Sequence, residues 1–82
     1  MAQVNWRKQL AKLLYNGDLE AASNLLEGGL RSNPRNISMK VELGKVQFMQ
    51  GDIDSARTTF EGVLLANPDN AEALKGKGDV LE

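Results

Sequence analysis

The chain has 82 residues, of which 41% are hydrophobic and 26% are charged, and this composition suits one small soluble domain. Its formal net charge of −1 gives no reason to expect nucleic acid or a membrane surface as a partner. No apolar run approaches the roughly 18 residues of a membrane span, and the first ten residues, MAQVNWRKQL, lack the apolar core of a signal peptide.

The residue types that carry most enzyme chemistry are missing. The chain has no histidine, which is the usual general base near neutral pH, and no cysteine for a disulfide, a thiolate or most zinc sites. The run Gly76-Lys77-Gly78 lacks the spacing and the preceding strand of a phosphate-binding loop. We therefore expect no catalytic activity, no metal site and no cofactor.

The first predicted helix covers residues 4–15, and Asn5 is suited to cap it. Its apolar residues are Leu10, Ala11, Leu13 and Leu14. Its charged residues are all basic: Arg7, Lys8 and Lys12. These cations either form a solvated face or attract an acidic peptide. Trp6 is either a packing anchor under the second helix or an exposed contact.

The second predicted helix covers residues 18–31. Its buried side is made of Leu19, Ala22, Leu26 and Leu30. Gly28 and Gly29 each cost about 1 kcal/mol relative to alanine in a helix, so the last turn is expected to be loose.

The third predicted helix, residues 37–50, has apolar residues on two sides. Met39, Leu43 and Val46 gather on one side, while Val41 and Phe48 lie roughly opposite, with Lys45 between the two groups. One explanation is that the two apolar sides pack against two neighbouring elements. The other is that Val41 and Phe48 form a surface for another molecule.

The fourth predicted helix covers residues 52–66. Its apolar positions are Ile53, Ala56, Phe60, Val63 and Leu64. The last segment, residues 71–82, contains Gly76 and Gly78 and so has low helix propensity. It is expected to be helical only because Ala73, Leu74 and Leu81 pack on the fourth helix.

The same short motifs recur 34 residues apart. Gly17-Asp18 returns as Gly51-Asp52, and Asn33-Pro34-Arg35-Asn36 returns as Asn67-Pro68-Asp69-Asn70. Glycine can end one helix in the left-handed conformation, the aspartate can cap the next, and the residue before proline leaves the helical region. This pattern predicts a repeated helical hairpin over residues 3–36 and 37–70, followed by a capping helix or partial third copy over residues 71–82.

A 34-residue period with two helices resembles the tetratricopeptide repeat. The residues of the second copy that fit the family pattern are Leu43, Gly44, Ala56, Phe60 and Pro68, whereas Lys40 and Gln47 replace aromatic residues of the pattern. The first copy supplies Ala22, Leu26 and Pro34. Its Leu10-Ala11 pair matches Leu43-Gly44 only if the turn between its helices is one residue shorter. The resemblance implies a single all-α domain, a helix-turn-helix repeat solenoid of two such units plus a C-terminal capping helix, with about five helices.

The resemblance also implies a non-catalytic module that binds a partner peptide or protein segment in a concave groove lined by the first helix of each hairpin. The residues predicted to bind the partner are Lys8, Lys12, Val41, Lys45, Phe48, Lys75 and Asp79. The cations at one end of the groove are Lys8, Lys12 and Lys45, and the acids at the other end are Asp79 and Glu82. This distribution favours a ligand that is acidic at the first repeat and basic at the last.

Two alternatives to this groove-binding prediction follow from the same pattern. The family's clamp for a C-terminal carboxylate is not expected, because Glu42, Glu72 and Gly76 stand where its asparagine, lysine and arginine would be. A structural or self-assembling segment of a longer repeat array stays open, since repeat units bury their faces against neighbours. If the segment is self-assembling, the chain is expected to form a homo-oligomer.

Overall fold

Residues 5–81 fold into five α-helices joined by short turns. A computed structural model describes the backbone of these residues and the side chains of residues 5–78. The helices are α1 (Trp6–Tyr15), α2 (Leu19–Ser32), α3 (Ile37–Met49), α4 (Ile53–Ala66) and α5 (Ala71–Leu81). The predicted all-α fold of two helical hairpins and a C-terminal helix is confirmed. None of the described helices combines the length and the apolar composition that a membrane span requires.

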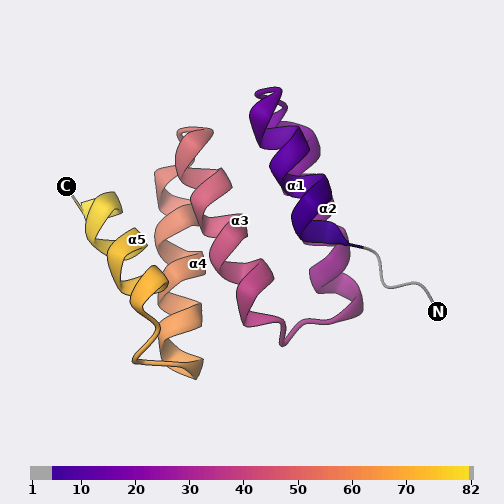
Figure 1. The fold of residues 1–82 in the computed structure, drawn as a ribbon. Coiled ribbons are helices and arrows are strands. Elements are labelled where there is room, and N and C mark those ends of the chain that lie inside the picture. The colour runs from indigo at the N-terminus through magenta and orange to yellow at the C-terminus, as the bar shows by residue number, and fades with distance from the viewer. Residues whose placement is uncertain (1–4, 82) are drawn as a thin grey trace.

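The helices form two layers, shown in Figure 1. α1, α3 and α5 lie nearer the viewer and are called the front layer, and α2 and α4 lie behind them as the back layer. α3 packs on α2, α4 and α5, while α4 also packs on α5. α3 is therefore the central helix, and α1 and α5 lie at opposite ends of the front layer.

Every helix begins at a side chain that caps it. The capping residues are Asn5, Asp18, Asn36, Asp52 and Asn70, and each side chain accepts a hydrogen bond of 2.9–3.4 Å from the backbone N–H three residues later. Each cap satisfies a donor that the helix leaves unpaired and contributes about 1 kcal/mol. The asparagines open the front-layer helices and the aspartates open the back-layer helices, so the caps predicted at Asn5 and Asp52 are confirmed.

The turn inside each hairpin is built on a glycine. Gly17 and Gly51 have φ angles of 75° and 85°, in the left-handed region that side-chain-bearing residues rarely adopt. The N–H of Asp18 donates to the carbonyl of Leu13, and that of Asp52 to the carbonyl of Gln47, both at 2.9 Å. The same backbone hydrogen bond, from an N–H to the carbonyl five residues earlier, therefore ends both α1 and α3.

These two turns have the same length, so the alignment of Leu10-Ala11 with Leu43-Gly44 is wrong. Three residues separate α1 from α2, and three separate α3 from α4. Leu10 therefore takes the place of Gly44, and Leu26 takes the place of Phe60. All four residues are buried. One hairpin pairs glycine with an aromatic ring where the other pairs two leucines, so both places remain apolar and filled.

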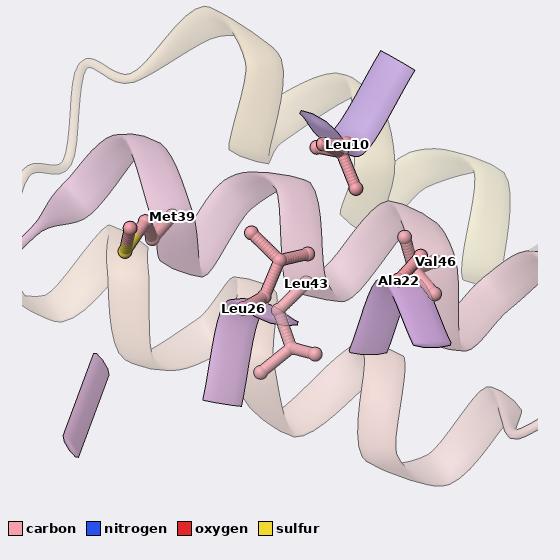
Figure 2. Packing of buried hydrophobic residues seen from close by; sticks show 6 residues of the cluster. All are labelled: Leu10, Ala22, Leu26, Met39, Leu43 and Val46. Atoms are coloured by element: carbon pink, nitrogen blue, oxygen red, sulfur yellow. The ribbon is translucent and has the colours of Figure 1, made fainter. Parts of the chain in front are cut away.

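Two apolar clusters lie on opposite sides of α3. The first joins α3 to the first hairpin and contains Leu10, Ala22, Leu26, Met39, Leu43 and Val46. In Figure 2, Leu26 and Leu43 lie together in the middle of this cluster, with Ala22 and Val46 further along. The second joins α3 to α4 and α5 and contains Val41, Ala56, Phe60, Val63 and Ala73. The structural explanation for the two apolar sides of α3 is therefore confirmed.

The ring of Phe60 lies between two glycines. A Cβ placed on Gly44 would lie 2.6 Å from the Cε1 atom of the ring, and one placed on Gly76 would clash with the Cζ atom and both Cε atoms of the same ring. Only glycine at both positions lets α3 and α5 approach Phe60 this closely. α5 is helical despite the low helix propensity of Gly76, because the missing side chain lets the α5 backbone pack against the Phe60 ring.

A second close contact occurs in α2, at Gly29. A Cβ on Gly29 would lie 2.5 Å from the Cε atom of Met39, whereas Gly28 and Gly62 have no neighbouring atom within 4 Å. α2 continues as a regular helix to Ser32. The expectation of a loose last turn is therefore wrong, and glycine at position 29 leaves room for the end of the Met39 side chain.

We predict that Gly44→Leu destabilises the fold by about 1–3 kcal/mol or more, because the new side chain must displace the Phe60 ring. The free energy of unfolding, measured by urea titration and circular dichroism, tests this. Gly62→Ala is the matched control, since open space there should make it neutral or stabilising by up to about 1 kcal/mol. Equal stability of Gly44→Leu and the wild type would show that α3 and α4 do not pack as described.

We predict that deletion of residues 71–82 causes unfolding or aggregation. Ala73 belongs to the cluster that buries Val41, Phe60 and Val63, each at most 1% exposed, and deletion uncovers that cluster. Two hairpins are also fewer than the roughly three repeats that such arrays generally need. Size-exclusion chromatography and circular dichroism test the prediction, and a truncated monomer with unchanged helical content per residue would contradict it.

Candidate partner-binding site

The front layer has a small apolar pocket between α3 and α5. It has a volume of about 140 Å³, and its lining residues are Lys45, Phe48, Met49, Phe60 and Gly76. Phe48 and Met49 are 40% and 50% exposed. Because Gly76 has no side chain, the ring of Phe60 is left to form part of the wall. We name this the Phe48 pocket.

A second pocket lies on the other side of α3, next to α1. Its volume is about 180 Å³, and its lining residues are Trp6, Arg7, Leu10, Ala11, Leu14 and Glu42. The guanidinium of Arg7 lies 4.6 Å from the centroid of the Trp6 ring, which is within cation–π range. Trp6 is partly buried against the first apolar cluster, so it is a packing anchor. We name this the Trp6 pocket.

Three charged side chains lie near the two pockets. The Nζ atom of Lys45 is 3.6 Å from a carboxylate oxygen of Glu42 on the same helix and 3.6 Å from one of Glu72 on α5. All three side chains are in contact with solvent, so these pairs contribute little to stability. Their consequence is electrostatic, because two carboxylates compensate the charge that Lys45 would otherwise offer to a ligand.

Val41 does not belong to this surface, and its predicted place in an open groove is wrong. Its side chain is 1% exposed and lies in the second apolar cluster with Phe60 and Ala73. Phe48 lies two turns further along the same side of α3 and remains 40% exposed. The cluster to which α5 contributes therefore covers the Val41 end of this apolar side of α3 and leaves the Phe48 end exposed.

The predicted cations of α1, Lys8 and Lys12, do not line the Trp6 pocket. Lys8 and Lys12 are exposed, but the basic residue among those that line the pocket is Arg7. The equal turn lengths explain the shift, since Arg7 and Ala11 stand 34 residues before Val41 and Lys45. A role of Lys8 and Lys12 in partner binding stays a prediction.

The predicted residues of α5 differ in how much the structure says of them. Lys75 lines a hollow of about 350 Å³ together with Lys45, Glu72 and Gly76. Asp79 lies within α5, but its side chain is outside the described part of the structure. Partner contacts of Lys45, Phe48, Lys75 and Asp79 therefore stay predictions.

Sequence reasoning did not assign Met49 or Gly76 to this surface, and it considered Arg7 only as one of the three cations of the first helix. Met49 follows Phe48 directly and is exposed beside it. No local signal shows that Gly76 faces the Phe60 ring.

The site offers apolar contacts and charges for binding. Among the described residues, no group of three or more histidine, cysteine, aspartate or glutamate residues is placed to hold a metal ion. Two stacked helical hairpins and a further helix, with pockets on the front layer, define a helical-repeat interaction module.

The chain belongs to the tetratricopeptide repeat family, whose sequence model matches residues 13–79. Members of this family generally mediate protein–protein interactions and are typically non-catalytic. No curated protein matches the chain closely enough to be reported as a relative.

We predict that Lys45→Met changes the free energy of unfolding by less than about 1 kcal/mol, because both of its ion pairs are solvated. Urea titrations at low and at high salt test this, and the small difference should shrink at high salt. A loss well above about 2 kcal/mol would instead mean that Lys45 fixes α5 against α3.

Proposed function

We propose that the chain binds a segment of another protein across the front layer, with Phe48 as the principal apolar contact. The observation that carries the proposal is the exposure of Phe48 and Met49 beside the Phe48 pocket. Single exposed apolar residues are ordinary on protein surfaces. Two adjacent ones beside an apolar hollow are a stronger indication of a binding surface.

The size of the Phe48 pocket limits what it can accept. Pockets for drug-sized molecules usually have volumes of about 300–1,000 Å³, whereas this one has about 140 Å³. It therefore suits one apolar side chain of a protein segment. Burial of one such side chain contributes roughly 1.5–3 kcal/mol, so further contacts along the front layer are needed for useful affinity.

Self-association is the second candidate function, and exposed leucines at the α4–α5 end of the molecule favour it. Leu65 is 88% exposed and Leu74 is 52% exposed. Leu65 lines a hollow of about 380 Å³ with Leu64, Glu61 and Lys77. Light scattering across a concentration series separates the two candidates, because a chain that stays monomeric does not use this surface for assembly.

We predict that peptides selected on the chain lose about 10- to 100-fold in affinity when Phe48 is replaced by serine. Binders come from a random dodecapeptide phage library, and their affinities are measured by fluorescence anisotropy on synthetic copies. Tyr15→Ser is the matched control, since Tyr15 is an exposed aromatic residue, 91% exposed, that does not line either pocket. An absence of binders, or equal losses in both variants, would contradict the proposed site.

A further inference from the structure

We infer that Asn16 is a site of spontaneous deamidation, and that the reaction proceeds through local opening of the end of α1. Asn16 and Gly17 are both exposed. They form the one asparagine–glycine pair of the sequence, since every other asparagine precedes proline or a residue with a side chain. Glycine leaves the asparagine side chain open to attack by the next backbone nitrogen, and it allows the backbone to turn into the reactive conformation.

The reaction consumes one water molecule and needs no partner. The backbone nitrogen of Gly17 loses its proton and attacks the side-chain carbonyl carbon of Asn16. A new C–N bond closes a five-membered succinimide ring, and the side-chain nitrogen leaves as ammonia after taking up a proton. Water then opens the ring at either carbonyl, which gives aspartate or isoaspartate. In isoaspartate the backbone continues through the former side-chain carbonyl.

The folded turn holds this pair in an unreactive geometry. The ψ angle of Asn16 is −5°, which eclipses the Gly17 nitrogen with the Asn16 nitrogen, whereas ring closure requires it to lie close to Cβ. The N–H of Gly17 donates to the carbonyl of Leu14 at 3.0 Å. The next N–H, that of Asp18, donates to the carbonyl of Leu13 at 2.9 Å. The turn must therefore open before Gly17 can attack.

α1 is well placed to open without the rest of the fold. It lies at one end of the front layer in Figure 1, and α2 is the one described helix that its backbone approaches closely. Of its 10 residues, Leu10 alone is fully buried. Segments with few buried contacts open at a low free-energy cost. α3 packs on α2, α4 and α5, so the matching turn after α3 should open much less often.

The second hairpin contains the same turn with glutamine in place of asparagine. Gln50 has a ψ angle of −8°, and the N–H of Gly51 donates to the carbonyl of Phe48 at 3.0 Å. Glutamine would have to close a six-membered ring, which forms more slowly. Exchange of Asn16 and Gln50 therefore separates the effect of residue type from the effect of helix packing.

Either product should weaken the end of α1. Aspartate at position 16 places a negative charge at the C-terminal end of the helix, where the dipole is already negative. Isoaspartate adds one carbon to the backbone between the groups that the two turn hydrogen bonds join. The modified chain should consequently unfold at a lower denaturant concentration than the fresh chain.

The test is incubation in mildly alkaline buffer, followed by peptide mapping with mass spectrometry. Wild type should be modified at Asn16 and Asn16→Gln should not, while Gln50→Asn should gain a second site. In guanidinium chloride that unfolds the Gln50→Asn chain, positions 16 and 50 should react at similar rates. In the folded chain, position 16 should react about tenfold or more slowly than in the unfolded chain, and position 50 more slowly again.

The dependence on denaturant identifies the opening step. A rate at Asn16 that stays constant below the unfolding transition supports local opening, because such an opening exposes little surface. A rate that rises in parallel with global unfolding would overturn local opening. Equal protection of positions 16 and 50 in Gln50→Asn would overturn the role of α1 packing. Equal rates at Asn16 in the folded and unfolded wild type would overturn protection by the turn, and an absence of product in both would overturn the site itself.

Discussion

The contact of the Phe60 ring with Gly44 and Gly76 is the interaction on which the rest of the structure depends. The ring comes from α4 and reaches the backbones of α3 and α5, so one side chain holds three helices together. Close packing in a protein interior requires that such a ring meets surfaces without gaps. The two glycines meet this requirement by letting the helix backbones approach the ring, and their position decides how α5 lies on the second hairpin.

The first hairpin fills the corresponding place between its two helices with different residues. Leu10 and Leu26 occupy the places of Gly44 and Phe60, and both are buried in the cluster that joins the first hairpin to α3. A small residue facing a large one has been exchanged for two of intermediate size. Cores tolerate such exchanges when volume and apolar pattern are retained, so two hairpins with few identical core residues adopt the same fold.

The helices, their caps and the hairpin turns could be predicted because each depends on residues close in sequence. Asp52 and Asn70 cap the helices that directly follow them, and Gly51 sits in the turn that it permits. The burial of Val41 could not be predicted in this way, since it depends on how α5 lies against α3. The ion pair between Lys45 and Glu72 could not be predicted either, because only the packing of α5 against α3 brings these two residues together.

Gly76 connects the stability of the fold with the candidate site. The absence of a side chain there lets α5 contact the Phe60 ring, and it also leaves space beside Phe48 and Met49. A larger residue would close the pocket and push α5 away from the core at the same time. The proposed binding surface is therefore a product of the way the last helix packs, and the carboxylate of Glu72 reaches Lys45 from that same helix. The shape of the Phe48 pocket and the pairing of Lys45 consequently depend on α5 being docked.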